Sequence, residues 1–333
     1  MTYIIAEIGV NHNGSPELAR EMVDMCIEAG VDAVKFQTYK AEEVMTDETP
    51  LADYMTEGSQ AESFLDLARK LELSNSQTAD LKAYTESKGG EFLSSPFDVP
   101  STYFLAELGL TKLKIPSGET VNPFLLKAAA ETGLELIIST GMCTMEEIHR
   151  SIEFLNQNNS GPISVLHCLT QYPAEYQYIN LNAIQAMKKE FGLPIGFSDH
   201  TPGIHASVAA VALGAEIIEK HVTLDKSLPG PDQAASLEPD ELKDLVRCIR
   251  DIESAMGDGQ KRPMGPEIEI ADIARKSLVF TNDLPADKIL ELKDLTAKRP
   301  GTGIAAFDFN YYVGKTLTNN VRKDQILTND IIG

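Results

Sequence analysis

Two histidines in this 333-residue sequence stand where a metal ion could be held. His200 follows the apolar run 195–199, and His221 ends the run 217–221. A lone histidine is more often a structural residue, but two that end adjacent β-like runs can converge on one ion. Imidazole and carboxylate ligands with open water positions suit Mn²⁺, Mg²⁺, Co²⁺ or Zn²⁺. His12 could join them, and the carboxylates that accompany the two histidines are Asp199 and Glu219.

Two lysines interrupt apolar runs in a way that indicates a bound anion. Lys35 and Lys114 each lie between apolar residues, where a charge is costly unless it meets an anion or a carboxylate. One explanation is a buried ion pair with Glu7 or Glu119. The other is an anionic ligand, which the hydroxyl groups at the ends of further runs favour, because lysines with several hydroxyl donors form phosphate or carboxylate pockets. These hydroxyls belong to Ser95, Ser117, Ser139 and Thr140.

Two acidic residues are candidates for proton transfer. Glu7 ends the first apolar run and could act as a general base, as an indirect metal ligand or as the partner of Lys35. Asp232 lies in the proline-rich turn 228–232 after the last run. Aspartate is common in turns for local reasons, but this turn belongs to the face that carries the other candidates.

All these residues lie at the ends of a repeated pattern. Eight short apolar runs end in polar residues, and most are followed by a helix-like segment. A strand and helix repeated eight times is typical of a (β/α)₈ TIM barrel, whose chemistry lies at the carboxyl ends of its strands. The sequence therefore predicts a barrel enzyme. The runs are 3–7, 33–37, 92–95, 113–119, 136–140, 165–170, 195–200 and 217–221.

The chain is long enough for a barrel of roughly 250 residues and a smaller domain. We predict a catalytic barrel over 1–256, a Gly- and Pro-rich linker over 257–275, and a small, mostly-β domain over 276–333. A domain of that size has little core of its own and is expected to pack against something else, such as another subunit. The long polar connection 40–60 is expected to face the active site and to close over or select the substrate.

Charge and composition narrow the class of partner. The net charge of −21 disfavours nucleic acid and anionic membranes as partners. No apolar stretch approaches the roughly 18 residues of a membrane span, and no signal-peptide pattern opens the sequence. The four cysteines form no CxxC pair. We therefore expect a cytoplasmic enzyme with reduced thiols.

A set of ordered motifs resembles the sialic acid synthase (N-acetylneuraminate synthase) family. The C-terminal motifs Ala274-Arg-Lys-Ser-Leu278 and Lys298-Arg-Pro-Gly301 resemble that family's antifreeze-like SAF domain, a β-clip fold. The resemblance covers nearly the whole chain. The barrel motifs are Ala6-Glu-Ile-Gly-Val-Asn-His-Asn-Gly14, Val34-Lys-Phe-Gln-Thr38, Ser95-Pro-Phe97, Lys114-Ile-Pro-Ser-Gly-Glu119, Ser139-Thr-Gly-Met142, His167-Cys168 with Tyr172-Pro173, Phe197-Ser-Asp-His-Thr201, Glu219-Lys-His221, Gly230-Pro-Asp232 and Ala235-Ser-Leu-Glu-Pro239.

The resemblance implies condensation of phosphoenolpyruvate with N-acetylmannosamine to a nine-carbon 2-keto sugar acid, with release of phosphate. It implies that His200 and His221 bind a divalent metal, most simply Mn²⁺, with Mg²⁺ or Co²⁺ as alternatives, and that Glu7 activates water or stabilises a cationic centre. Arg299 would reach the site of a partner subunit in a homodimer with exchanged SAF domains. Phosphoenolpyruvate would be held by Lys35, Ser95, Lys114, Ser117 and Ser139, and the sugar by Gln37, Thr170, Tyr172 and Asp232.

Several alternatives remain open at this point. Gln171 and Gln233 stand where the family commonly has an acidic residue and a histidine, which makes the identity of the sugar less secure than the reaction. A legionaminate-type synthase using a 6-deoxy diacetamido hexose is the closest alternative, followed by a pseudaminate synthase. A metal-dependent aldolase or a hydrolase of the same fold, or a non-catalytic sugar-binding protein, would not depend on phosphoenolpyruvate.

Overall fold

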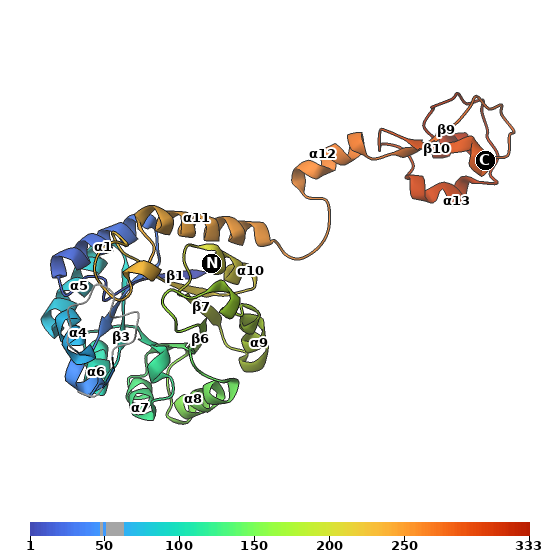
Figure 1. The fold of residues 1–333 in the computed structure, drawn as a ribbon. Helices are drawn as coiled ribbons and strands as arrows, with labels where there is room; N and C mark the ends of the chain where they lie inside the picture. The colour runs from blue at the N-terminus through green and yellow to red at the C-terminus, as the bar shows by residue number, and fades with distance from the viewer. Residues whose placement is uncertain (47–48, 51–62) are drawn as a thin grey trace. The chain divides into compact units, whose positions relative to one another are not determined.

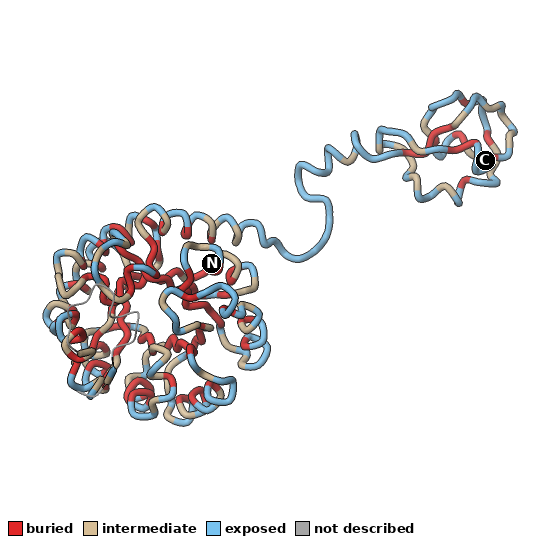
Figure 2. Tube along the Cα trace, viewed as in Figure 1, coloured by how far each residue is buried: buried red, intermediate tan, exposed pale blue. Residues whose placement is uncertain are grey.

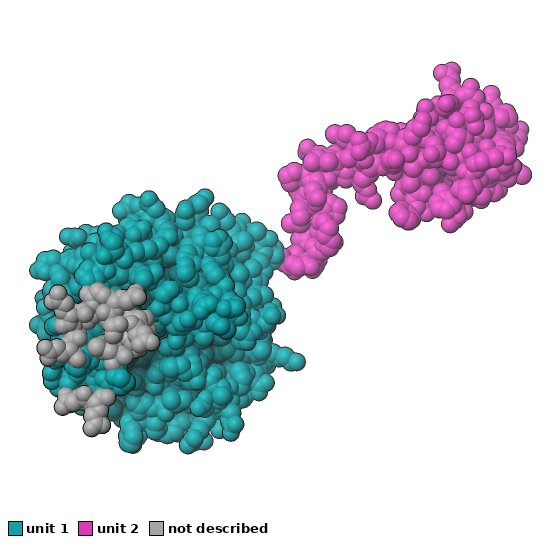
Figure 3. Space-filling model, in the orientation of Figure 1, with its two compact units in different colours: residues 1–257 teal, residues 258–333 magenta. Residues whose placement is uncertain are grey.

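The computed structural model describes residues 1–46, 49–50 and 63–333. The chain forms two compact units, Met1–Gly257 and Asp258–Gly333 (Figure 3). Most of the connection 40–60, with its expected role in substrate selection, therefore lies outside the described residues. No helix within the described ranges is long and apolar enough to cross a membrane.

Eight parallel strands form the centre of the first unit, in the order β3-β2-β1-β8-β7-β6-β5-β4. The two end strands, β3 and β4, also lie side by side, and an ion pair of 2.9 Å joins Lys112 Nζ to Glu91 at their beginnings. The sheet thus curls into the predicted barrel (Figure 1). The strands are β1 Tyr3–Gly9, β2 Ala33–Thr38, β3 Glu91–Pro96, β4 Lys112–Ile115, β5 Glu135–Ser139, β6 Ile163–Cys168, β7 Ile195–Asp199 and β8 Ile217–His221.

Helices surround this barrel, and local capping fixes where several of them begin. The Ser15 hydroxyl accepts from the Leu18 N–H at the start of α1, and Gly30 ends that helix in the left-handed region at φ 82°. Helices α5 and α8 begin with capping boxes at Ser74 and Thr144. The helices are α1 Pro16–Ala29, α2 Ala41–Val44, α4 Phe64–Leu71, α5 Asn75–Ser87, α6 Val99–Glu107, α7 Pro123–Glu131, α8 Met145–Gln157, α9 Asn182–Phe191, α10 His205–Ala212 and α11 Pro239–Met256.

The strands divide the barrel into an outer apolar core and an inner stack of side chains, because successive residues point to opposite faces. Outward residues such as Ile4, Ala6 and Ile8 pack against the helices. The inward residues form an apolar layer, and most residues of the barrel strands are buried (Figure 2). Two residues further along each strand, the inward side chains become polar. The apolar layer consists of Ile5, Ala33, Leu93, Ile137, Leu166 and Ile217.

The second unit contains helix α12 Gly265–Ala274, the antiparallel strands β9 Ser277–Phe280 and β10 Leu295–Lys298, and the short helix α13 Phe309–Tyr312. Isolated β-bridges connect the remaining segments. The unit has its own small core, which includes Leu278, Phe280, Leu317 and Leu327. The predicted fold, a TIM barrel followed by a small mostly-β domain, is confirmed.

Candidate active site

The ends of β1, β2, β3 and β8 bring four charged or hydroxyl side chains into one buried network. In the strand ladders Glu7 lies opposite Lys35 on one side and His221 on the other. The Lys35 ammonium contacts Glu7 Oε2 at 2.8 Å and donates to the Ser95 hydroxyl at 2.9 Å. The predicted ion pair between Lys35 and Glu7 is therefore present. Glu119, the second carboxylate considered as a partner for a lysine, instead accepts from Asn122 at 2.6 Å.

Glu219 is the central carboxylate of this network, and sequence reasoning placed it only beside His221. It lies 3.6 Å from Lys35 Nζ and 3.5 Å from Lys114 Nζ, and it accepts from the Ser198 hydroxyl at 2.9 Å. The signal was available in the sequence, because Ile217, Glu219 and His221 alternate along one strand and so point to the same face.

Burial and charge separate the acidities of the two carboxyl groups. Burial raises the pKa of Glu7 to about 7, although Lys35 opposes this shift. Burial acts in the same direction on Glu219, but the two ammonium groups of Lys114 and Lys35 outweigh it and hold the pKa of Glu219 at about 2. Glu219 is thus a fixed anion at neutral pH. Glu7 lies near its titration point, as a group that accepts and donates a proton must.

Hydroxyl groups and a close backbone turn form a small polar cradle next to Lys114. Ser117 Oγ accepts from the Gly141 N–H at 3.0 Å. A Cβ at Gly141 would lie 2.1 Å from Thr170 Oγ1 and 2.8 Å from Ser117 Oγ, so only glycine fits this approach. The Ser139 hydroxyl is buried and has no hydrogen-bond partner among the described residues. A buried, unpaired hydroxyl that lines the same cavity as the Lys114 ammonium group suits an oxyanion.

The two histidines predicted as metal ligands lie together at the ends of β7 and β8. Their ring centroids are 5.4 Å apart, and the Tyr172 ring lies 4.1 Å from His200 and 5.7 Å from His221. The His200 Nδ1–H donates to the Leu169 carbonyl at 2.7 Å, which leaves Nε2 free to bind a metal. Burial, His200 and Lys35 keep the pKa of His221 well below its usual range, so this imidazole is neutral.

The donor set fits a divalent cation in part. His221 Nδ1 is buried without a hydrogen bond among the described residues and lies 3.7 Å from Asp232 Oδ2. Across the described ranges, however, no group of three His, Cys, Asp or Glu side chains has the geometry to hold a metal. The two imidazoles would therefore supply two positions, and water or substrate the others.

Two suggested companions of the histidines point elsewhere. Asp199 faces the outside of the barrel, where it pairs with Lys220 at 3.1 Å and accepts from the Ser207 hydroxyl at 2.6 Å. The reason is again the alternation along the strand, which puts Asp199 and His200 on opposite faces. The His12 Nδ1 accepts from the Gly14 N–H at 3.0 Å, and His12 is not among the residues that line the cavity.

A cavity of about 270 Å³ opens over the polar layer. Burial raises the pKa of Asp232, which lines it, to about 6 against the opposing charges of His200 and Lys35. Lys35 lies behind the lining. Ser198 and Cys168 line the cavity as well and were not predicted as site residues, and so does Glu219, which was predicted only as the carboxylate beside His221. The predicted residues in the lining are Glu7, Gln37, Ser95, Lys114, Ser117, Ser139, Thr170, Tyr172, His200, His221 and Asp232.

Arg299 and the two departures from the family pattern are not among the residues that line this cavity. The Arg299 side chain belongs to the second unit, is exposed, and donates from Nε to the Ala274 carbonyl at 2.9 Å. Gln233 is buried, accepts from the Thr223 hydroxyl, and donates to the Asn11 carbonyl at 3.1 Å. Gln171 is exposed and does not line the cavity. Neither glutamine therefore faces the cavity.

Ionisable side chains gathered in a cavity at the carboxyl ends of barrel strands define a TIM-barrel enzyme with a site for a small anionic substrate. The sequence matches the NeuB family over residues 22–261 and the SAF domain over residues 275–332. The chain belongs to the NeuB family. The predicted family and SAF domain are thereby confirmed, as is the predicted class of enzyme, a phosphoenolpyruvate-dependent nonulosonic acid synthase that forms a carbon–carbon bond.

The relatives span nearly the whole chain. An N,N'-diacetyllegionaminic acid synthase of Campylobacter jejuni is 44% identical over 98% of this chain and 98% of its own length. An enzyme of the same name from Legionella pneumophila is 43% identical over 96% of this chain and 91% of its own length. A crystal structure of an N-acetylneuraminic acid synthetase from Leptospira borgpetersenii is 38% identical with a TM-score of 0.72, covering 81% of this chain and 90% of that one.

Proposed function

We propose that this chain is a legionaminate-type synthase. It condenses phosphoenolpyruvate with a 6-deoxy diacetamido hexose and releases phosphate and a nine-carbon 2-keto sugar acid. The observation that carries the proposal is the 44% and 43% identity, over nearly the full chain, to two enzymes named for this product. The sequence motifs alone favoured N-acetylmannosamine as the acceptor. The comparisons support the alternative better, since the N-acetylneuraminic acid synthetase is 38% identical.

The anionic donor substrate fits the side of the cavity that carries Lys114 and the hydroxyls. We assign phosphoenolpyruvate to Lys35, Lys114, Ser95, Ser117 and Ser139. The unpaired hydroxyl of Ser139 and the Gly141 cradle support a phosphate or carboxylate there. Because Lys35 is already paired with Glu7 and Glu219, its ammonium adds less net positive charge than a lone lysine. We therefore expect Lys114 and the hydroxyls to provide most of the affinity for the phosphate.

We assign the acceptor to Gln37, Thr170, Tyr172 and Asp232, with its aldehyde at His200 and His221. A divalent cation bound there, Mn²⁺ in our assignment with Mg²⁺ or Co²⁺ as alternatives, would polarise the aldehyde as a Lewis acid. The Leu169 carbonyl fixes the orientation of the His200 ring, and the neutral state of His221 keeps a nitrogen lone pair available.

The reaction needs one proton donor, for the aldehyde oxygen, and one proton acceptor, for the added water. The methylene carbon of phosphoenolpyruvate bonds to the aldehyde carbon, whose oxygen takes a proton, and the former enol carbon becomes cationic. Water adds to that carbon and loses a proton, and the tetrahedral intermediate expels phosphate as its carbon–oxygen bond breaks. Glu7, with its pKa near 7, suits the group that takes the proton from water. Glu219, which stays ionised, suits the stabilisation of the cationic carbon.

A phosphate-release assay with Mn²⁺ and phosphoenolpyruvate tests the proposal. We expect kcat/KM for the 6-deoxy diacetamido hexose to exceed that for N-acetylmannosamine by about tenfold or more. Preference for N-acetylmannosamine would overturn the legionaminate assignment and restore N-acetylneuraminate synthesis. Turnover of a sugar without phosphoenolpyruvate would indicate an aldolase or hydrolase instead.

The second unit has a role in this proposal. Arg299 would hydrogen-bond an acetamido group in the site of a second copy, in a homodimer with exchanged SAF domains. Its exposure and its place in a separately folded unit support this role. An enzyme with these substrates belongs in the cytoplasm, where we place it.

A further inference from the structure

The cavity has a second side that the assignments above do not use. The strand ends are polar, whereas this second side consists of apolar side chains. They come from α2, from the residue after α2, and from α4. We call this surface the apolar wall. It is formed by Val44, Met45, Phe64, Leu67, Ala68 and Leu71.

The apolar wall belongs to a small core of its own. Leu67, Ala68 and Leu71 are buried together with Val10 and Tyr39, and Val44 at the end of α2 and Met45 directly after it pack against them. The Tyr39 hydroxyl donates to the Ala68 carbonyl at 3.1 Å, and the Tyr39 ring meets the Phe97 ring edge-on. The wall is thus continuous with packed side chains and is not a loose flap on the barrel.

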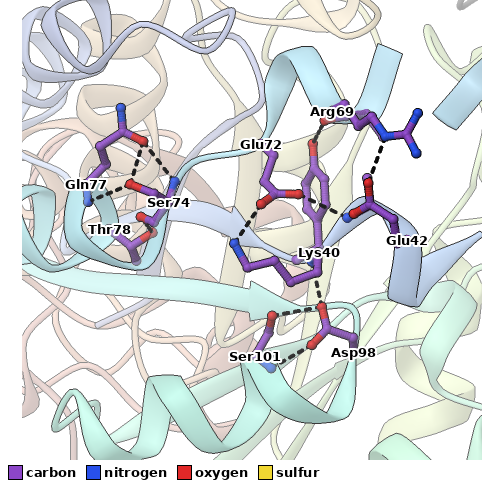
Figure 4. Close-up of polar contacts among 12 residues, drawn as sticks. Lys40, Glu42, Arg69, Glu72, Ser74, Gln77, Thr78, Asp98 and Ser101 are labelled. Atoms are coloured by element: carbon purple, nitrogen blue, oxygen red, sulfur yellow. Dashed lines mark hydrogen bonds and ion pairs between the residues drawn. The ribbon is translucent and has the colours of Figure 1, made fainter. Parts of the chain in front are cut away.

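Polar contacts hold the two helices of the wall together (Figure 4). The Glu72 carboxylate, directly after α4, contacts Lys40 Nζ at 2.6 Å and accepts from the Ala41 N–H at 3.0 Å. The Lys40 N–H in turn donates to Asp98 at 2.8 Å. Arg69 and Glu42 add an ion pair of 2.7 Å between α4 and α2. These contacts fix the start of α2 to the end of α4 and to the start of α6, so the apolar surface is preorganised.

The place of the wall in the barrel decides which part of a ligand reaches it. It is contributed by the segment that joins β2 to β3, whereas His200 and His221 end β7 and β8, on the far side of β1 in the strand order. An acceptor whose aldehyde carbon lies at the two histidines therefore directs the other end of its carbon chain away from them. That end is C6.

We propose that the apolar wall is the subsite for the C6 methyl group of a 6-deoxy acceptor sugar. The inference rests on the proposed function and deepens it by naming the residues that select the sugar. Valine, leucine, phenylalanine and alanine side chains carry no hydrogen-bonding group, and the thioether of Met45 is only a weak acceptor. A methyl group gains from burial against them, whereas a C6 hydroxyl there loses its water without a replacement partner.

Two substitutions convert part of the wall to polar surface at nearly constant shape. Val44→Thr replaces one methyl group by a hydroxyl, and Met45→Gln replaces the thioether by an amide. Both residues are only half-buried, so the double variant is expected to fold, which a melting curve checks. The matched control is Val121→Thr with Met256→Gln, since both positions are exposed and lie outside the lining of this cavity.

The measurement compares two acceptors that differ only at C6, 6-deoxy-N-acetylmannosamine and N-acetylmannosamine, beside the 6-deoxy diacetamido hexose. The wild-type protein is expected to favour the 6-deoxy member of the pair. In the double variant we expect the ratio of the two kcat/KM values to fall by about tenfold, as one hydrophobic group in a pocket allows. The KM for phosphoenolpyruvate and the ratio in the control variant should stay unchanged.

The outcomes separate the two proposals. A wild-type protein that favours N-acetylmannosamine over the diacetamido sugar defeats the proposed function, while the pair that differs at C6 still tests the wall. An equal ratio in the wild-type protein and the folded double variant defeats the wall as the C6 subsite. A protein inactive on all three acceptors defeats both.

Discussion

At the scale of single residues, Glu7 and Glu219 show how one buried network gives two carboxyl groups different pKa values. Both are almost completely buried, and Lys35 contacts both. Glu219 has a second ammonium group, that of Lys114, at 3.5 Å. Lys114 is the largest of the charges that lower the pKa of Glu219 to about 2, while burial raises the pKa of Glu7 to about 7.

The pKa of Glu7 predicts the pH dependence of the reaction. If Glu7 takes the proton from water, its deprotonated form is active, so kcat should rise with pH and level off above about 7. Glu7→Gln should lower kcat by about 10²- to 10⁴-fold and remove this rise. Steady-state rates from pH 5.5 to 8.5, roughly one pH unit and more on each side of that pKa, give the profile. Glu131→Gln, on the exposed face of α7, is the control, and an unchanged profile in Glu7→Gln would rule out the role.

Sequence reasoning identified most of the residues that line the cavity, but not which of the carboxylates near the histidines face it. The motifs and strand ends named Glu7, Lys114 and His221, because a polar residue at the end of an apolar run is visible in the sequence. Sequence reasoning did not distinguish Glu219, which faces the barrel interior, from Asp199, which faces outward. Asp199 directly precedes His200, and Glu219 is separated from His221 by one residue. Side chains alternate between the two faces of a strand, so one residue known to point inward determines the direction of all the others. Ile217 is such a residue in β8, and it places Glu219 in the barrel interior.

At the scale of elements, β7 and β8 are joined outside the barrel by the Asp199–Lys220 ion pair, in which both side chains are fully buried. Lys220 also donates to the Thr201 carbonyl. These residues directly precede His200 and His221 and are partners in the strand ladder. The pair therefore fixes the two histidines relative to each other.

Breaking this pair should destabilise the protein strongly. Asp199→Asn leaves the Lys220 charge buried without its counter-ion, so we expect the free energy of unfolding to fall by about 3–5 kcal/mol, measured by urea denaturation. Adding Lys220→Met should recover part of that loss, because the uncompensated charge is then removed. Calorimetric titration should also show weaker Mn²⁺ binding in the folded double variant. Unchanged affinity would mean that the pair stabilises the strands without positioning the histidines.

The contacts between α2 and α4 differ in strength, which allows a comparison within one surface. Glu72 accepts a backbone N–H as well as the Lys40 ammonium, whereas Arg69 and Glu42 form an exposed pair. We expect Glu72→Ala to lower stability by about 1–3 kcal/mol, since the Ala41 N–H loses its partner, and to raise the acceptor KM. Arg69→Ala should lower stability much less than Glu72→Ala, because water screens the exposed pair. Thermal melting and acceptor kinetics of both variants test this, and equal effects would contradict it.

The order of strands and helices was largely predictable, since apolar runs and caps are local signals. The helix-like segments expected after the apolar runs are present, among them α6 at Val99–Glu107 after β3 and α8 at Met145–Gln157 after β5. Sequence reasoning found no helix in the segment after β2 and described 40–60 as one polar connection. It contains the short helix α2, which has no hydrophobic period and is fixed by Glu72 from a distant part of the chain. Such tertiary contacts leave no periodic pattern in the sequence.

At the scale of the whole molecule, the chain consists of two units with separate cores. The expectation that the small domain packs against another subunit, and the domain boundaries at 256 and 275, stay predictions. The isoleucines of α12, which are Ile268, Ile270 and Ile273, are exposed and are not part of the core of the second unit. An apolar helix of this kind favours a partner surface.

A mixture of two variants that we expect to be inactive at low acceptor concentration tests whether the site is shared between subunits. His221→Ala removes one of the two imidazoles that we propose as metal ligands, and Arg299→Ala removes the guanidinium of the second unit. If SAF domains are exchanged, a mixed dimer contains one site in which the intact barrel of one chain meets the intact Arg299 of the other. Random reassembly of equal amounts then restores roughly a quarter of the wild-type activity, because half of the dimers are mixed and one of their two sites is whole.

The control for this experiment pairs two barrel variants, His221→Ala and Asp232→Asn, because both residues line the same cavity. In a mixed dimer of these two variants one barrel carries His221→Ala and the other carries Asp232→Asn. Neither barrel is intact, so mixing restores no activity even if the SAF domains are exchanged. The alternative, an Arg299 that serves its own barrel, predicts that mixing His221→Ala with Arg299→Ala also restores nothing. Because each variant keeps its own fold and differs from the wild type at one side chain, the contrast between the two mixtures isolates the route by which Arg299 reaches the acceptor sugar.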